Sequence, residues 1–115
     1  MENKRQKRYR RHKRIRSKIV GAEDRPRLSI FRSNQHIYLQ LIDDKKGRTL
    51  ASASDLSVKK KGLTKVQIAR EVGIILAKDI LSQGIKKIVF DRSGYKYHGR
   101  VKSVAEALRE QGVKF

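Results

Sequence analysis

The sequence predicts an α/β domain with a mixed four-stranded sheet and two helices, preceded by a basic N-terminal arm. Two neighbouring segments alternate apolar and polar residues as strands do, and a later segment repeats apolar residues at helical spacing. A short apolar strand and a second helix follow, which gives the order arm, β, β, β, α, β, α. Strands joined by tight turns pair antiparallel, whereas a β–α–β unit makes a parallel pair, so the sheet is expected to be mixed.

The positive charge is concentrated in the arm. The 115 residues carry 30 Lys and Arg against 11 Asp and Glu, a net charge of +19. Residues 1–18 hold ten of these bases and one acid, a net charge of +9. Such a block cannot bury enough apolar surface to fold alone. We therefore expect residues 1–24 to form a flexible arm that becomes helical when bound, and residues 25–115 to form the globular domain. The alternatives for the arm are a solubilising tail or a targeting signal.

Arg27–Ser33 and His36–Ile42 are the first two predicted strands. Apolar residues fall at every second position in both, and a short polar turn at residues 33–35 joins them into a hairpin. A turn around Gly47 leads into Thr49–Ser54, a third strand of small residues. These three segments account for the antiparallel part of the sheet.

The two predicted helices are recognised by sequence signals at their ends and by the spacing of their apolar residues. Thr64 followed three residues later by Gln67 is a capping box, and apolar residues then recur at helical spacing until Gly84, which suits a helix C-terminus. Ile85–Asp91 has the continuous apolar run of a strand covered on both faces. Arg100–Gln111 is predicted to be the last helix, with an apolar face directed toward the sheet.

Asp91–Arg100 (DRSGYKYHGR) is the segment richest in groups that suit nucleic acid. It combines three cations with two tyrosines, a histidine and two glycines between a strand end and a helix start. The helix start offers N–H groups to a phosphate, and the tyrosines can stack on exposed bases. The alternative is that one tyrosine is a structural residue at the core edge. Ser33, Asn34 and His36 form a second polar patch at the hairpin turn, although turn chemistry alone would explain Ser33 and Asn34. The lysine loop Ser57–Gly62 is either a second RNA contact or simply exposed.

Enzyme and membrane functions fit the sequence poorly. No apolar run approaches the ~18–20 residues that span a bilayer, and an apolar signal segment is not expected. The chain has no Cys and three isolated His, so we expect neither a zinc site nor another cofactor. A metal-dependent nuclease is the serious rival because Asp43, Asp44 and Asp91 lie at strand ends, but the first strand carries no acid to complete a two-metal site. The charge favours nucleic acid as the partner, ahead of an anionic membrane surface.

The chain resembles the family of bacterial-type large-subunit ribosomal proteins numbered eighteen, which bind 5S rRNA. The resemblance is carried by RIRSKIVG at the end of the arm, RPRLSIFRSNQHIYLQLIDD, TLASAS and FDRSGYKYHGRVKSVAEALREQGVKF. It implies a fold of the translational-machinery type, with ribonuclease-H-like topology but without catalytic carboxylates. It also implies a structural, non-enzymatic role in the central protuberance, where the protein attaches 5S rRNA to the large-subunit rRNA beside neighbouring 5S-binding ribosomal proteins.

Two positions depart from the family pattern. Ser93 stands where the family usually has a glycine, so either Ser93 tolerates that backbone or the turn shifts slightly. Leu39 replaces a commonly small residue. We expect a cytoplasmic ribosomal protein that is monomeric away from the ribosome, with an organellar ribosome as the alternative. The expected RNA-contacting residues are Lys4, Arg5, Lys7, Arg8, Arg10, Arg11, Lys13, Arg14, Arg16, Lys18, Arg25, Arg27, Arg32, Ser33, Asn34, His36, Arg92, Ser93, Gly94, Tyr95, Tyr97, His98, Gly99 and Arg100.

Overall fold

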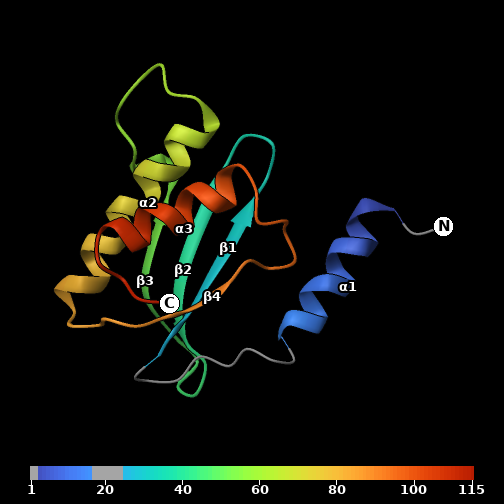
Figure 1. Cartoon of the computed structure of the whole chain (residues 1–115), viewed down its shortest axis with the longest axis horizontal. Coiled ribbons are helices and arrows are strands. Elements are labelled where there is room, and N and C mark those ends of the chain that lie inside the picture. Colours follow the sequence, from blue (N-terminus) through green and yellow to red (C-terminus); the bar gives the residue numbers. More distant parts are fainter. Residues whose placement is uncertain (1–2, 17–24) are drawn as a thin grey trace.

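A computed structural model describes residues 3–16 and 25–115, with backbone only at residues 12–16. The predicted order of elements is confirmed (Figure 1). The elements are α1 (Lys4–Arg16), β1 (Arg27–Arg32), β2 (Ile37–Asp43), β3 (Arg48–Ser54), the 3-10 turn η1 (Asp55–Ser57), α2 (Lys65–Ser82), β4 (Val89–Asp91) and α3 (Arg100–Glu110). The boundary between arm and globular domain stays a prediction because residues 17–24, Lys18 among them, lie outside the described part.

The sheet is mixed, as predicted. Its strand order is β3-β2-β1-β4, in which β1 and β2 and likewise β2 and β3 pair antiparallel, while β1 and β4 pair parallel. The α/β class with four strands is thus confirmed, and the ribonuclease-H-like topology implied by the resemblance stays a prediction. The arrangement places β1 at the centre, between the hairpin partner β2 and the late strand β4.

The fourth strand is shorter than predicted. We expected Ile85–Asp91, but β4 covers only Val89–Asp91. Val89 N donates to the carbonyl of Pro26 at 2.9 Å, and β1 begins directly after that proline, so Ile88 has no residue of β1 to pair with. Ile88 N donates instead to the carbonyl of Lys114 at 3.0 Å, and this hydrogen bond holds the C-terminal residues beside the start of β4.

The two predicted helices lie together over one face of the sheet (Figure 1). The capping box of α2 is present, because Gln67 N donates to Thr64 Oγ1 at 3.2 Å and Thr64 N donates to Gln67 Oε1 at 2.8 Å. Gly84 has a φ of +79°, the left-handed conformation that ends helices. The buried helix residues are Ala69, Val72, Gly73, Leu76, Ala77 and Ile80 in α2 and Val101, Val104, Ala105, Ala107 and Leu108 in α3.

The alternation of β1 and β2 sorts their side chains between the two faces of the sheet. The apolar residues under the helices are essentially inaccessible: Leu28, Ile30, Ile37, Leu39 and Leu41. Leu39 is 0% exposed, so the larger side chain at this position packs fully into the core. The opposite face carries no described helix, and two aromatic rings remain exposed on it, those of Phe31 and Tyr38.

The arm forms a helix between Lys4 and Arg16 (α1). Its first turn is held by a reciprocal pair, in which Gln6 N donates to Asn3 Oδ1 at 2.9 Å and Asn3 N donates to Gln6 Oε1 at 3.0 Å. This is a capping box built from an asparagine and a glutamine. A short helix that is polar all round has little stability of its own, so its contacts with the rest of the chain decide where it lies.

Candidate nucleic-acid interface

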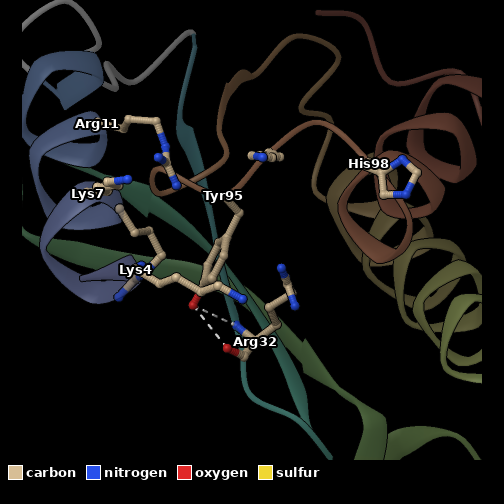
Figure 2. Close-up of a pocket in the computed structure, with 8 residues that line it drawn as sticks. Lys4, Lys7, Arg11, Arg32, Tyr95 and His98 are labelled. Carbon is tan, nitrogen blue, oxygen red and sulfur yellow. Dashed lines mark hydrogen bonds between the residues drawn. The ribbon is translucent and has the colours of Figure 1, made fainter. Parts of the chain in front are cut away.

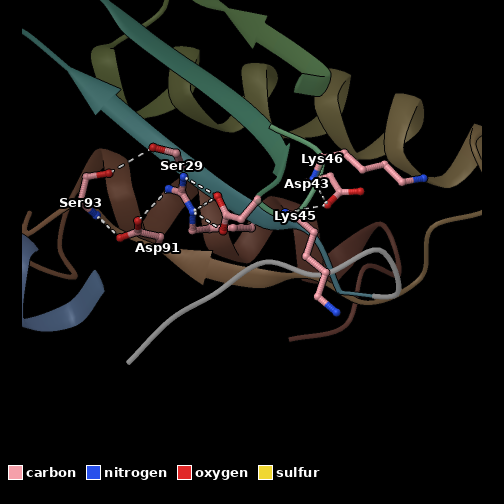
Figure 3. Close-up of polar contacts among 8 residues, drawn as sticks. Ser29, Asp43, Lys45, Lys46, Asp91 and Ser93 are labelled. Carbon is pink, nitrogen blue, oxygen red and sulfur yellow. Dashed lines mark hydrogen bonds and ion pairs between the residues drawn. The ribbon is translucent and has the colours of Figure 1, made fainter. Parts of the chain in front are cut away.

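The turn after β4 is held by a buried carboxylate. Asp91 is fully inaccessible and its Oδ1 accepts a hydrogen bond from Ser93 N at 2.9 Å. Ser93 has a φ of +57°, a left-handed backbone that costs a residue with a β-carbon about 1–2 kcal/mol. The Ser93 and Ser29 hydroxyls lie 3.4 Å apart (Figure 3). Of the two expected alternatives, the structure therefore shows the one in which Ser93 tolerates a glycine-like backbone.

The guanidinium of Arg27 binds the other side of Asp91. Arg27 Nη1 donates to Asp91 Oδ2 at 3.0 Å, and Arg27 Nε lies 3.1 Å from Asp44 Oδ2. Burial acts to lower the pKa of Arg27, but the hydrogen bonds and charges of Asp44 and then Asp91 outweigh it and raise the pKa above its ordinary value. Arg27 is only 8% exposed, so its charge is used inside the protein. Its predicted contact with RNA stays a prediction.

Helix α1 docks onto the turn that Asp91 holds. Arg8 Nη1 donates to the carbonyl of Ser93 at 3.1 Å, and Arg11 Nε donates to the carbonyl of Gly94 at 3.0 Å. The two arginines are three positions apart, so they lie on the same face of the helix. Carbonyls presented by a left-handed turn thus position a helix that comes from the opposite end of the chain.

The two tyrosines of the loop have different environments. Tyr95 is 7% exposed; its hydroxyl donates to the carbonyl of Arg32 at 3.0 Å and accepts from Arg32 N at 3.3 Å. The guanidinium carbons of Arg8 and Arg32 lie 4.6 and 4.9 Å from the centroid of its ring, within cation–π range. Tyr97 is 42% exposed. Tyr95 is therefore the structural tyrosine that the sequence left unassigned, and Tyr97 is the one accessible to a ligand.

These contacts leave a half-open cleft of about 520 Å³ between α1, the end of β1 and the loop after β4. In Figure 2, side chains of α1 face Tyr95 and Arg32 across this space. The residues that line it, called the basic cleft below, are Lys4, Lys7, Arg8, Arg11, Arg32, Tyr95, Lys96 and His98. Among the residues whose side chains the structure describes, none in this lining is acidic, which suits the basic cleft to anions.

The positive field of this region acts on a neighbouring arginine. Burial, and after it repulsion from the charge of Arg32, lowers the pKa of Arg100 below its ordinary value.

Lys96 lines the basic cleft but is missing from the predicted contact residues, although its place among the cations of Asp91–Arg100 is a usable signal. Arg5 and Arg10 are exposed on α1, and Arg25 is also exposed.

The hairpin tip does not belong to the basic cleft. Ser33 Oγ accepts from His36 N at 3.2 Å, and Ser33 N donates to the His36 carbonyl at 2.8 Å, so turn chemistry explains Ser33. His36 Nδ1 lies 2.8 Å from Asp55 Oδ2. Burial acts to raise the pKa of Asp55, but the hydrogen bonds of His36 and of Ile37 N outweigh it and lower the pKa. Asn34 is exposed beside them.

The remaining predicted residues lie around the loop or in the last turns of α1. Arg92 is half-buried, Gly94 is buried, and Gly99 caps α3 with a φ of +55° and no side-chain acceptor. Lys13, Arg14 and Arg16 lie in α1, where only the backbone is described. RNA contacts by all of these residues stay predictions.

Replacing Tyr95 by phenylalanine tests the structural assignment. Tyr95→Phe keeps the ring but removes the hydroxyl that bonds both backbone groups of Arg32, so we expect the free energy of unfolding to fall by about 0.5–1.5 kcal/mol. Tyr97→Phe, at an exposed ring, is the matched control and should leave stability nearly unchanged. Urea unfolding of both variants measures the difference, and equal stabilities would contradict the assignment.

Among the residues whose side chains are described, 3–11 and 25–115, no three His, Asp or Glu side chains lie close enough together to hold a metal ion. None of the helices within residues 3–16 and 25–115 is long and apolar enough to cross a lipid bilayer. A basic cleft built on a mixed α/β sheet defines a protein of the class that binds polyanions. Comparison with known proteins makes the class specific.

A family model described as ribosomal L18 of archaea, bacteria, mitochondria and chloroplast matches residues 2–115. Similar proteins named large ribosomal subunit protein uL18 include one from Thermotoga petrophila, 52% identical over 118 residues that cover 99% of this chain and 97% of the relative. Another, from Limosilactobacillus reuteri, is 56% identical over 108 residues, with 94% and 92% covered. The chain belongs to the ribosomal L18 family, whose members are structural proteins of the large ribosomal subunit and not enzymes.

Proposed function

We propose that this protein binds 5S rRNA and helps to attach it to the large-subunit rRNA in the central protuberance. The observation that carries the proposal is the basic cleft, in which four cations of α1 meet Arg32, Lys96 and His98 with no acid among the described lining residues. Membership of the L18 family supports 5S rRNA as the ligand through the resemblance stated above. Other 5S-binding ribosomal proteins are the expected neighbours.

The predicted contact residues divide by their accessibility. Those that are exposed or half-exposed are proposed to touch RNA: Lys4, Arg5, Lys7, Arg8, Arg10, Arg11, Arg25, Arg32, Ser33, Asn34, His36, Arg92, Tyr97, His98, Gly99 and Arg100, with Lys96 added. The charge of Lys13, Arg14, Arg16 and Lys18 supports the same role. Arg27, Ser93, Gly94 and Tyr95 are buried, so we propose that they position the others.

The mechanism is electrostatic and shape-dependent. Each cation that neutralises a phosphate releases condensed counterions, which makes the affinity high at low salt and weaker as salt is added. The deep major groove of A-form RNA hides the base edges, so a cleft lined by cations reads mainly the path of the backbone. Residues 1–24 act as an arm on a globular domain of residues 25–115. Within this arm, α1 contacts the domain at the carbonyls of Ser93 and Gly94.

Binding of 5S rRNA is tested by competition. The full chain is titrated with labelled 5S rRNA in the presence of an unrelated structured RNA of the same length, at several salt concentrations. We expect the affinity of the protein for 5S rRNA to be well above its affinity for the competitor at every salt concentration. Equal affinities would show that the protein holds RNA only through charge, and would overturn the assignment of 5S rRNA.

The basic cleft is tested by two of its three exposed lysines, Lys7 and Lys96. Lys7→Gln with Lys96→Gln should flatten the plot of log affinity against log salt by roughly 0.7–0.9 for each phosphate that the cleft no longer neutralises. Lys78→Gln with Lys86→Gln removes the same charge from exposed positions that do not line the cleft. If both double variants flatten the plot equally, the cleft has no special part in binding.

A further inference from the structure

The sheet face opposite α2 and α3 carries an exposed aromatic pair. Phe31 of β1 and Tyr38 of β2 are directly opposite each other in the antiparallel register. Paired residues point to the same side of a sheet, and side chains at such positions are close neighbours. Phe31 is 57% exposed and Tyr38 is 40% exposed, whereas the next pair, Ile30 and Leu39, is buried under the helices. The two rings thus stand side by side on an uncovered surface.

The described residues that follow the rings along this face of β2 and β3 are polar and uncharged. Gln40 and Ser52 follow on the same face through the pairings of β2 with β1 and β3, and Gln40 Nε2 donates to the hydroxyl of Tyr38 at 3.3 Å. Amide and hydroxyl groups of this kind can bond the edges of bases, and an aromatic ring offers any base a stacking surface. A neutral aromatic surface is unsuited to phosphates, so its ligand must differ from that of the basic cleft.

The position of the pair links it to the cleft. Arg32, which lines the basic cleft, follows Phe31 directly in β1, so the two side chains point to opposite sides of the sheet at the end of this strand. An RNA strand whose phosphates lie in the cleft therefore reaches the aromatic surface by passing around the end of β1. A protein with a net charge of +19 recruits polyanions before neutral proteins, which favours RNA over a protein as the occupant of this face.

We propose that Phe31 and Tyr38 form a stacking platform for unpaired bases of the RNA whose backbone lies in the basic cleft. This inference rests on the proposed function and adds to it a second subsite with a different chemistry. The cleft binds phosphates and depends on salt, whereas the platform binds base faces and does not. Such a platform confines binding to RNA that presents unpaired nucleotides beside a helix.

Affinity measurements separate the two subsites. Phe31→Thr with Tyr38→Thr removes both rings while keeping residues that suit a strand. We expect the affinity for 5S rRNA to fall by roughly 5- to 150-fold for each stacked base, with the salt dependence unchanged. Phe31→Tyr with Tyr38→Phe keeps both rings and should bind like the parent protein. Circular dichroism and urea unfolding establish that both double variants are folded.

A spectroscopic probe reports stacking directly. The chain contains no tryptophan, so Phe31→Trp introduces a single tryptophan on the platform, whose emission is recorded with selective excitation apart from that of the four tyrosines. Its emission should be quenched by 5S rRNA and by single-stranded oligoadenylate, but not by linear polyphosphate, which has the charge without the bases. Val66→Trp places the control emitter on α2, on the far side of the sheet, at a position that is 47% exposed. It should be quenched little by any of the three.

Two results would overturn the proposal: equal affinity of the threonine double variant and the parent protein for 5S rRNA, or equal quenching of Phe31→Trp by RNA and polyphosphate. The first would leave the aromatic face to a protein neighbour. Failure of the proposed function looks different, because then the parent protein itself would not prefer 5S rRNA over the unrelated competitor.

Discussion

Arg27→Met should lower the free energy of unfolding by about 3–5 kcal/mol, the cost of removing one partner from a buried ion pair. The guanidinium lies 3.0 Å from Asp91 and 3.1 Å from Asp44, and the side chain of Asp91 is 0% exposed. The substitution preserves most of the side-chain volume but removes the positive charge beside two carboxylates. Urea unfolding followed by circular dichroism measures the decrease.

Arg70→Met is the matched control for this substitution. Arg70 pairs with Glu110 at 2.6 Å, but both side chains are about half exposed, so water replaces the missing partner at little cost. A double variant, Arg27→Met with Asp91→Asn, should recover part of the stability because one buried charge disappears with its partner. If Arg27→Met costs no more than Arg70→Met, the buried cluster does not hold the turn after β4.

Deletion of residues 1–18 should have the largest effect on RNA binding. The segment carries ten basic residues, and each phosphate that is neutralised contributes roughly 0.7–0.9 to the slope of log affinity against log salt. The slope should therefore fall by several units, together with most of the affinity at low salt. Filter binding to 5S rRNA at a series of salt concentrations measures both quantities, and an unchanged slope would show that the arm is a passive tail.

A rearranged arm separates charge from geometry. If residues 3–16 are shuffled so that Arg8 and Arg11 no longer lie on one face, the net charge is kept but docking on the Ser93 and Gly94 carbonyls is abolished. We expect this variant to keep most of the salt dependence and to lose preference for 5S rRNA over an unrelated RNA. Full preference in the shuffled protein would mean that docking of α1 contributes nothing to specificity.

Local patterns in the sequence predicted most of the fold. The alternation of Arg27–Ser33 identified β1 to within one residue, and Thr64 with Gln67 identified the start of α2. These signals work because each depends on neighbours within a few positions of the chain. Asn3 and Gln6 carry the same kind of signal at the start of α1, but the dense charge of the arm masks it because a polar segment has no apolar periodicity to mark a helix.

The site depended on contacts that no local pattern encodes. Arg27 was expected to touch RNA because it is basic, yet its partners are Asp44, 17 positions away, and Asp91, 64 positions away. Whether a cation is neutralised inside the protein or presented to a ligand is decided by such pairings. The shortening of β4 has a similar origin, because the length of a strand is set by its partner and β1 begins only after Pro26.

The docking of α1 joins residues that are made at very different times. Arg8 and Arg11 bond carbonyls that lie 85 and 83 positions later in the chain. At a synthesis rate of 5–20 residues per second, roughly 4–17 s separate the two sides of this interaction. Every newly made chain therefore passes through a stage in which its cationic segment exists without the turn that gives it a fixed position.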